Sequence, residues 1–296
     1  MVSRLLSRPL PRGDQLGVFS EARVLVEEFG RNLLALILYP VRRDRKTVDA
    51  EYNDGRWQGI LSGKRWLGCK TLSDFVIPPG DKWRIAKVGN KCYRTSDQEY
   101  YRYRTAVLQD VVGKLTPACT ELVELGGGYG ANLFALALGE KKWNRLIGLD
   151  ISKNAIQAGR EIASHFGLTQ QISFDTLDII KGSDLTFRHL RGRAVLTYYC
   201  LEQLKHDTRI VIENILKAGP SRVIHIEPTF ELLHLSSLKD VVTYLYIVRK
   251  DYQDNLLSTL KEYERKGKVK VLMVERLYYA PTVRNDPTLI CWEPCL

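Results

Sequence analysis

A glycine-rich segment contains the most informative chemistry of the chain. It reads Glu121-Leu-Val-Glu-Leu-Gly-Gly-Gly-Tyr-Gly-Ala-Asn132, an apolar run that enters glycines and continues into a helix-forming stretch. Glycines at Gly126, Gly128 and Gly130 allow a sharp turn and let a ligand approach the backbone without Cβ atoms in the way. A strand, a glycine turn and a helix in this order are typical of a site for a nucleotide-containing ligand.

Two ligand classes fit this turn. Gly126, Gly128 and Ala131 match the dinucleotide pattern G-x-G-x-x-A, and Asp150 follows at the distance expected of a ribose-binding acid. Glu124 separates the two classes, because a carboxylate near the end of a buried strand is costly unless it is paired. It would repel a pyrophosphate lying over the turn, whereas a ligand that carries a sulfonium and an ammonium group tolerates it. The acid therefore favours a cationic ligand.

With this acid in place, the sequence resembles the class I S-adenosylmethionine-dependent methyltransferases, whose first motif is an acid followed by G-x-G-x-G. Glu124-Leu-Gly126-Gly-Gly128-Tyr-Gly130 matches every position of that motif. The resemblance covers residues 100 to 296 and includes the second acid, Asp150. It implies an enzyme that uses S-adenosylmethionine, with a nicotinamide enzyme as the minor alternative.

The resemblance implies roles around the methionine and ribose parts of the cofactor. Glu124 and the backbone of Gly126–Gly130 would lie near the methionine moiety, and Asp150 would accept hydrogen bonds from both ribose hydroxyls. Capping of the following helix is the alternative role for Asp150. Tyr101 and Arg104, on the helix before the first strand, would reach the cofactor carboxylate; a solvated helical face is the equal alternative for these two.

Further roles concern the adenine and the sulfonium. Asp178 would meet the adenine amino group, with Asp175 as the second candidate. Ile151 and Ile179 would sandwich the adenine ring. Tyr198 lies at the end of the fourth expected strand, within Thr197-Tyr-Tyr-Cys-Leu-Glu-Gln-Leu204. This segment resembles the one that passes beneath the sulfonium, so Tyr198 would be a cofactor-binding residue.

Methyl transfer is an in-line displacement, so the protein mainly aligns the acceptor and excludes water, and a base is needed where the acceptor must lose a proton. The acceptor is expected above the carboxyl ends of strands four and five. The candidate catalytic residues there are Glu202, His225 and Glu227, with Tyr199 and His206 nearby. By the period of two, His225 and Glu227 share one strand face and would form a base and its orienter; the alternative is a buried histidine satisfied by a neighbour. Glu202 would otherwise begin the following helix as a favourable N-terminal charge.

Several departures from the family pattern narrow the range of possible methyl acceptors. Tyr198-Tyr199 stands where relatives that methylate bases and amides carry Asn or Asp followed by two prolines and an aromatic residue. No clustered Asp or Asn signature predicts a metal site. Aromatic residues, among them Trp57 and Trp83, are frequent in the first 115 residues and suit sugar rings. The leading hypothesis is therefore O-methylation of a hydroxyl of a sugar, a sugar chain or a related natural product.

Two other functions remain open. Residues 1–120 hold 21 lysines and arginines against 13 acids, whereas residues 121–296 hold 23 against 21, so the net charge of +10 belongs mainly to the first part. That part could contact phosphates, and its aromatic residues could stack on bases, as in an RNA methyltransferase. It would equally suit a small-molecule or glycan acceptor that is phosphorylated or carboxylated. The third hypothesis is a module that binds the cofactor without catalysis.

Alternating apolar runs and amphipathic stretches predict a parallel doubly wound α/β fold after residue 115. Strands are expected at Glu121–Leu125, Arg145–Asp150, Gln171–Phe174, Ala194–Tyr198, Arg222–Glu227, Val269–Val274 and Thr288–Trp292. Helices are expected at Asn132–Leu138, Lys153–Phe166, His206–Lys217 and, as one long helix, Leu238–Lys266. Only the last two strands lack a helix between them. The expected architecture is a Rossmann-like seven-stranded methyltransferase sheet with a terminal antiparallel hairpin, over residues 116–296.

Residues 1–115 are expected to form a helical and irregular extension that serves as a lid and acceptor platform. Residues 16–39 show helical spacing, either as one helix or as two with a break at Gly30. Residues 40–95 are rich in turn residues and predict irregular loops with a small hairpin. Ser96 and Glu99 form a capping box for a helix that runs to about Gly113.

The composition, 45% hydrophobic and 26% charged over 296 residues, is ordinary for a globular protein. The longest apolar run, Leu33 to Leu38, falls short of the roughly 20 residues of a membrane span. The residues from Met1 to Pro9 lack the apolar core of a signal peptide, so a cytoplasmic location is expected. Six scattered cysteines without a C-x-x-C pair predict reduced thiols.

Overall fold

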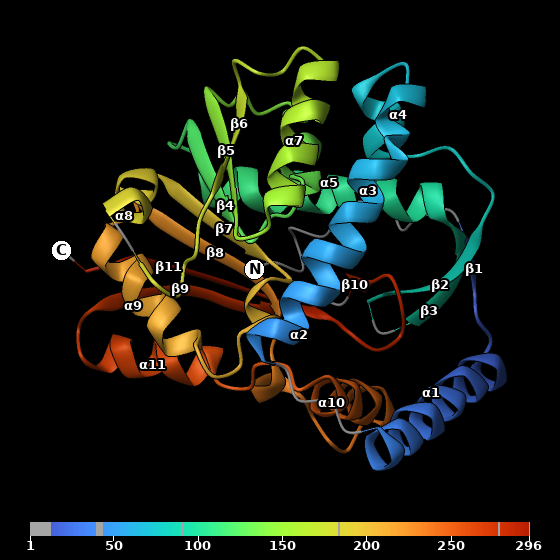
Figure 1. The fold of residues 1–296 in the computed structure, drawn as a ribbon. Coiled ribbons are helices and arrows are strands. Elements are labelled where there is room, and N and C mark those ends of the chain that lie inside the picture. Colours follow the sequence, from blue (N-terminus) through green and yellow to red (C-terminus); the bar gives the residue numbers. More distant parts are fainter. Residues whose placement is uncertain (1–12, 40–43, 90, 183, 278, 296) are drawn as a thin grey trace.

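The computed structural model describes residues 13–39, 44–89, 91–182, 184–277 and 279–295. Its centre is a seven-stranded sheet in the order β6-β5-β4-β7-β8-β11-β9 (Figure 1). The strands are β4 (Glu121–Leu125), β5 (Arg145–Asp150), β6 (Ile172–Thr176), β7 (Ala194–Tyr198), β8 (Arg222–Pro228), β9 (Val269–Arg276) and β11 (Pro287–Pro294). From β6 to β8 all neighbours are parallel, whereas β11 pairs antiparallel with both β8 and β9. The predicted Rossmann-like sheet with its terminal antiparallel hairpin is confirmed.

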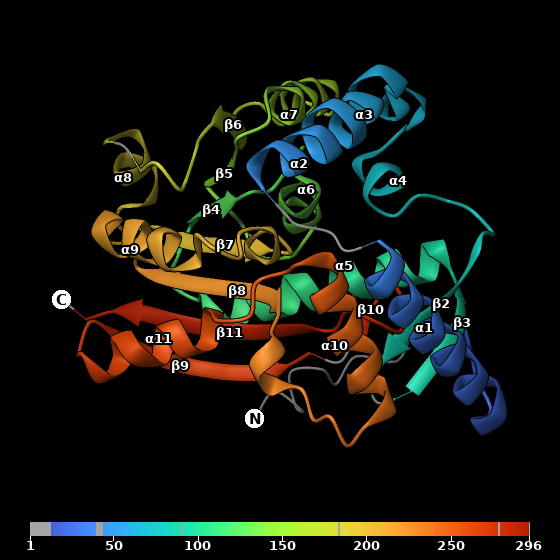
Figure 2. The ribbon, with the colours of Figure 1, turned by 60° about the horizontal axis from the view of Figure 1, so that its bottom comes forward.

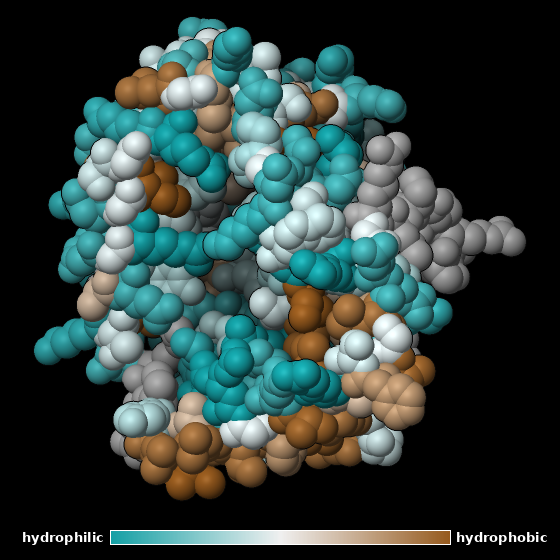
Figure 3. Space-filling view, turned by 90° about the vertical axis from the view of Figure 1, so that its right-hand side faces the viewer, coloured by the Kyte–Doolittle hydropathy of each residue, from teal (hydrophilic) through white to brown (hydrophobic). Residues whose placement is uncertain are grey.

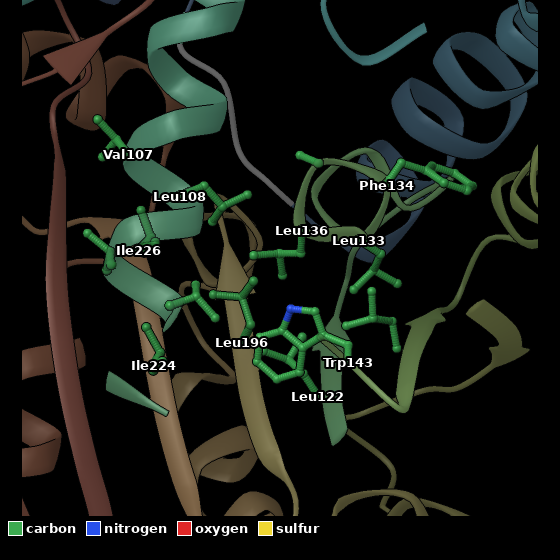
Figure 4. Close-up of a cluster of buried hydrophobic side chains, with 14 of the residues drawn as sticks. Val107, Leu108, Leu122, Leu133, Phe134, Leu136, Trp143, Leu196, Ile224 and Ile226 are labelled. Carbon is green, nitrogen blue, oxygen red and sulfur yellow. The ribbon is translucent and has the colours of Figure 1, made fainter. Parts of the chain in front are cut away.

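Helices cover both faces of this sheet because successive strand residues point to opposite sides. Leu122 and Ile224 pack into one apolar cluster with α5 (Asp97–Leu115), α6 (Ala131–Ala137) and α7 (Lys153–His165). Figure 4 shows Val107 and Leu108 of α5 in this cluster, beside the β8 side chains. Val123 packs into the opposite cluster with α9 (Thr208–Ala218) and α11 (Leu256–Arg265), and α8 (Asp184–Leu190) lies at its edge.

Polar side chains set the beginnings of two helices that flank the site. The Ser152 hydroxyl caps α7 by accepting the backbone N–H of Ala155 at 3.2 Å. The Ser96 hydroxyl caps α5 in the same way, with the N–H of Glu99 at 3.2 Å. In the predicted capping box, Glu99 would also accept the backbone N–H of Ser96. The Glu99 carboxylate instead pairs with Arg102.

The extension begins with α1 (Val18–Leu38), one continuous helix that passes through Gly30 without a break. It lies beside α10 (Leu238–Lys250) in Figures 1 and 2, and Glu21 pairs there with Lys239 at 2.5 Å. The outer side of α1 carries exposed apolar residues, among them Val18, Phe19, Val26, Leu34, Ile37 and Leu38. Figure 3 views the molecule from the right-hand side of Figure 1 and shows apolar side chains gathered along the lower edge.

The expectation of irregular loops before the hairpin was wrong for much of residues 44–76. Helix α2 (Arg45–Asp49), the π-helical segment Ala50–Trp57 and α3 (Gln58–Gly63) form one helical run beside α7, and α4 (Leu72–Val76) follows. The Ser152 hydroxyl donates to Asn53 Oδ1 at 2.7 Å, and the Asn154 amide donates to the Asn53 carbonyl at 3.0 Å. These tertiary contacts outweigh the weak helical preference of a segment rich in Gly, Asn and Asp. Residues 40–43 lie outside the described part.

The predicted small hairpin is confirmed as β2 (Trp83–Val88) and β3 (Lys91–Ser96). Together with β1 (Gly13–Gln15) and β10 (Tyr279–Ala280), it forms a second sheet in the order β1-β3-β2-β10. A strand from the C-terminal part of the chain therefore completes the sheet of the N-terminal extension.

The prediction of one helix over Leu238–Lys266 was wrong. Helix α10 ends at Lys250, Asp251 adopts a left-handed conformation with φ 52°, and α11 begins at Leu256. The buried Gln253 side chain holds the connection, because its oxygen accepts the N–H of Leu256 at 3.0 Å and its nitrogen donates to the Pro228 carbonyl at 2.9 Å. The apolar periodicity continues across the break, which is why the sequence does not reveal it.

All six cysteines are free thiols, as predicted. Across the described ranges, no helix combines the length and the apolar character needed to cross a membrane.

Candidate functional site

A cavity of about 620 Å³ lies at the carboxyl ends of the central parallel strands. Its wall combines the glycine turn after β4 with parts of the extension and of the C-terminal region. Most of the predicted site residues line it, namely Tyr101, Arg104, Glu124, Gly126, Asp150, Ile151, Asp178, Ile179, Tyr198 and Glu202. Gly128, Gly130, His225 and Glu227 are not part of its wall. The structure thus brings together residues from both halves of the chain.

The glycine turn is packed closely by other segments. Gly126 and Gly128 have φ angles of 63° and 57°, in the left-handed region that favours glycine. A Cβ atom on Gly126 would lie 2.0 Å from the Cys200 sulfur, and one on Gly128 would lie 2.7 Å from a Trp57 ring carbon. Trp57 of the extension therefore covers the turn directly. Gly130 stands at the N-cap of α6.

Asp150 joins the glycine turn to the start of α7. Its Oδ2 accepts the backbone N–H of Gly128 and its Oδ1 that of Ser152, each at 2.8 Å. Burial raises the pKa of Asp150, against the effect of these hydrogen bonds. The capping alternative for Asp150 is wrong, because the Ser152 side chain caps α7.

Glu124 is fully buried and forms one end of a polar chain. Its Oε1 accepts a hydrogen bond from the Asn132 amide, whose oxygen accepts one from the Arg104 guanidinium. Glu124 Oε2 has no hydrogen-bond partner among the described residues. Burial raises the pKa of Glu124 to about 7. A buried, unpaired carboxylate oxygen at a cavity wall suits a ligand that donates from a cationic group.

Arg104 is held inside the protein. Its Nε donates to the Tyr198 hydroxyl at 3.1 Å, and that hydroxyl lies 3.1 Å from the hydroxyl of Tyr279. The guanidinium also lies over the Tyr198 ring, 4.6 Å from its centroid. The alternative of a solvated helical face is therefore wrong for Arg104.

Of the two aspartates that follow the third expected strand, Asp178 lines the cavity. Asp175 lies on β6 with a half-exposed carboxylate, 3.6 Å from His189 Nε2. Ile151 and Ile179 lie with Asp178 in the same wall. Of the two candidates, only Asp178 therefore belongs to the cavity wall.

Glu202 and Glu227 occupy different places. The Glu202 side chain lines the cavity and accepts hydrogen bonds from the Gln203 amide at 2.7 Å and the Asn285 amide at 3.3 Å. The Glu227 carboxylate is fully buried behind it and accepts the backbone N–H groups of Cys200 and Leu201 at 3.0 and 3.1 Å. Burial raises the pKa of Glu227 to about 7. Glu227 therefore holds the turn that carries Glu202 and lies outside the cavity wall.

His225, predicted as a catalytic residue, lies in the core and not in the cavity wall. It is fully buried, its Nδ1 lies 2.9 Å from the Thr197 hydroxyl, and Trp292 Nε1 donates to its Nε2 at 2.9 Å. Burial lowers the pKa of His225 to about 3. The ring is neutral and both nitrogens are engaged, so it is the satisfied buried histidine of the alternative interpretation. His206 does not line the cavity, whereas Tyr199 does.

Several wall residues were not among the predicted site residues, including Asn132, Gln203 and Asn285, and Trp57 was named only as one of the aromatic residues of the extension. Asn132 follows the glycine motif directly and could have been included on that ground. Trp57 and Asn285 have no comparable signal, because only the tertiary structure brings them to the glycine turn and to Glu202. For metals, the described residues contain no group of three or more His, Cys, Asp or Glu side chains that could hold an ion.

No protein-family model matches the sequence, and no curated protein matches it in a sequence comparison. Among solved structures, the chain is similar to a small RNA methyltransferase, with a TM-score of 0.50 and 12% identity over 63% of this chain and 24% of that one. The chain has the class I methyltransferase fold.

Other class I methyltransferases are similar over more of their own length. A geranyl diphosphate methyltransferase bound to its substrate and sinefungin matches with 10% identity over 67% of this chain and 80% of that one, at a TM-score of 0.49. A magnesium protoporphyrin methyltransferase from Synechocystis matches with 13% identity over 66% and 82%, at a TM-score of 0.45.

Proposed function

We propose that this protein is an S-adenosylmethionine-dependent methyltransferase that O-methylates a hydroxyl of a sugar, a sugar chain or a related natural product. The proposal rests above all on three carboxylates at one cavity beside a glycine turn. Glu124, Asp150 and Asp178 come from or directly follow three neighbouring strands and line the same wall. Such a wall repels a pyrophosphate and suits a cationic ligand that contains a ribose.

The residues present fit this cofactor. The unpaired Oε2 of Glu124 would accept from the ammonium group, and each Asp150 oxygen retains a lone pair for a ribose hydroxyl. Asp178 would accept from the adenine amino group, between Ile151 and Ile179 as hydrophobic walls. When bound, the cofactor supplies a methyl group on a sulfonium.

Glu202 is the general base of the proposed reaction. It is the carboxylate candidate from the segment after β7 that lines the cavity, and its two amide partners hold it in place. With the methyl group supplied by the bound cofactor, the acceptor hydroxyl would take up that group, and Glu202 would accept the hydroxyl proton and pass it to solvent. The tyrosine, tryptophan and arginine side chains in the wall would bind the acceptor ring and any anionic substituent. Among them are Trp57, Tyr246, Arg56, Arg84 and Arg284.

Residues 1–115 are proposed to act as a lid and acceptor platform over a cofactor-binding domain of residues 116–296. Trp57 covers Gly128 of the glycine turn. Glu28 of α1 lies 3.4 Å from Arg284, which lines the cavity and stacks over the Tyr246 ring. A lid that packs on both the turn and the acceptor end would exclude water from the transfer.

The test combines calorimetry with product analysis. S-adenosylmethionine and S-adenosylhomocysteine should bind in titration calorimetry, whereas NADH should not. Mass spectrometry of reactions with neutral glycosides, glucuronides and sugar phosphates should show a mass gain of one methylene group. Methylation of RNA with a steep salt dependence of binding would contradict the sugar assignment. Cofactor binding without any methylated product would favour a binding module.

A further inference from the structure

The Glu202 carboxylate accepts hydrogen bonds from two side-chain amides, one of the neighbouring residue Gln203 and one of Asn285, which lies far along the chain. Gln203 Nε2 donates to its Oε1 at 2.7 Å, and Asn285 Nδ2 donates to its Oε2 at 3.3 Å. All three residues line the cavity, and Gln203 is 9% exposed. The cluster Glu202, Gln203 and Asn285 is called the amide cradle below.

The amide cradle has unused acceptor capacity. A carboxylate only accepts hydrogen bonds, so both amides must turn their nitrogens toward Glu202 and their oxygens away from it. Gln203 Oε1 and Asn285 Oδ1 are both buried, and neither has a hydrogen-bond partner within the described ranges of the chain. An unpaired buried acceptor destabilises a protein, because nothing compensates for the loss of its hydrogen bonds to water. A donor on a molecule bound in the cavity would remove that cost.

Asn285 is held rigidly by its neighbours. The Tyr199 hydroxyl donates to the Asn285 carbonyl at 2.7 Å. The next residue, Asp286, is buried and pairs with Lys87 of β2 and with Arg276 of β9, the latter at 3.2 Å. The loop before β11 is therefore attached to both sheets, which positions the Asn285 amide.

The other side of the amide cradle is equally fixed. Glu227 accepts the backbone N–H groups at the start of the short helix that carries Glu202 and Gln203. The Glu202 carbonyl accepts the N–H of Gln253 at 3.0 Å. Groups held by supporting contacts on several elements are suited to recognise a specific arrangement of ligand atoms.

We propose that Gln203 and Asn285 are specificity-determining residues that bind hydroxyl groups next to the one presented to Glu202. The inference rests on the proposed function for the reaction, and it adds the substrate class: an acceptor with neighbouring hydroxyls, such as a vicinal diol or triol of a sugar ring. The same two amides orient Glu202, so they act as positioning residues for the base. An acceptor with a single isolated hydroxyl would leave their oxygens unpaired.

Binding of methyl glucoside and its monodeoxy derivatives tests the assignment without any methyl transfer. Affinities are measured by calorimetry or ligand-observed NMR, with and without saturating S-adenosylhomocysteine. Removal of at least one hydroxyl should weaken binding to the wild type about tenfold, the effect of one hydrogen bond. In Gln203→Met or Asn285→Leu, the parent glucoside should bind about tenfold more weakly, and the penalty for the matching deoxy derivative should vanish.

A matched control is Gln157→Met, because Gln157 donates to the Glu161 carboxylate at 3.1 Å on the exposed side of α7, away from the cavity. It should leave all affinities unchanged. Unaltered deoxy penalties in both amide variants would overturn the assignment, as would a wild type that binds no glucoside. If a variant does not fold, the affinities of the wild type for the monodeoxy glucosides still decide whether the protein recognises neighbouring hydroxyls.

A kinetic measurement separates positioning from general destabilisation. Gln203→Glu removes the amide donor and adds a second carboxylate beside Glu202, so the acid limb of the pH–kcat profile should move to higher pH. An unmoved profile would contradict the positioning role. Glucoside discrimination in a protein that transfers no methyl group would contradict the proposed function alone and leave the amide cradle in place.

Discussion

Tyr199 donates its hydroxyl to the backbone carbonyl oxygen of Asn285 at 2.7 Å and so joins the end of β7 to the loop before β11. Tyr199 has a φ of 51°, in a region that non-glycine residues rarely adopt. Such strain persists only where the surroundings over-determine the conformation, and it is concentrated at functional sites. The end of β7 and the loop before β11 are therefore one unit.

Tyr199→Phe removes this hydrogen bond while it keeps the ring. We expect the free energy of unfolding to fall by about 1 kcal/mol, and the KM for the acceptor to rise several-fold because the loop before β11 loosens. The dissociation constant for S-adenosylmethionine should stay constant, which calorimetry checks. A change in cofactor affinity with an unchanged acceptor KM would contradict the coupling.

Asp150→Ala should weaken S-adenosylmethionine binding by about 1–3 kcal/mol, because hydrogen bonds to a charged acceptor are lost. Titration calorimetry measures the effect. Asp175→Ala is the matched control, since Asp175 lies on the neighbouring strand β6 but outside the cavity wall, and it should bind the cofactor normally. Unchanged binding by Asp150→Ala would refute the ribose role.

The affinity for S-adenosylmethionine should depend on pH through Glu124, whose pKa burial raises to about 7. The ionised carboxylate, present above that pKa, attracts the cationic ligand, and protonation removes the attraction as the pH falls. Between pH 8 and pH 6 the dissociation constant should rise about tenfold. In Glu124→Gln the affinity should be weak and flat over this range; a slope that survives the substitution would assign the titration to another group.

His225→Phe separates a structural histidine from a catalytic one. The Trp292 N–H would lose its partner in the core and the Thr197 hydroxyl one of its contacts, so the free energy of unfolding should fall by about 1–3 kcal/mol. The kcat measured at a temperature where the variant is folded should stay within about threefold of the wild type. A loss of activity of a hundredfold or more in folded protein would restore His225 as a catalytic candidate.

Lys87 is 1% exposed and pairs with the buried Asp286. Lys87→Met leaves that carboxylate with Arg276 alone, so denaturant unfolding should show a loss of about 1–3 kcal/mol, the effect of a lost hydrogen bond to a buried charge. Lys91→Met, at the exposed start of β3, changes a lysine of the same hairpin and should cost less than about 0.5 kcal/mol. Similar losses in both variants would contradict the importance of the buried pair.

The parts of the fold that were predicted correctly depend on local signals. The alternation of apolar runs and amphipathic stretches indicates the parallel sheet, and the missing helix before β11 indicates the antiparallel hairpin. The predictions failed where neighbours in space overrule local preference. The helical run of residues 45–63 forms against α7 despite its turn residues, and the helix break at Asp251 depends on the buried Gln253 side chain.

The sequence by itself determined the glycine turn, its acids Glu124 and Asp150 and the class of fold, because motif spacing along a strand–turn–helix unit translates directly into geometry. Only the tertiary structure decided which polar groups meet at the acceptor end. Residue types and the period of two cannot distinguish a carboxylate in the cavity from one behind it, so Glu202 and Glu227 were equal candidates. Their roles differ because they have different partners. The Asn285 amide, from far along the chain, donates to the Glu202 carboxylate, whereas backbone N–H groups of the turn after β7 donate to the Glu227 carboxylate.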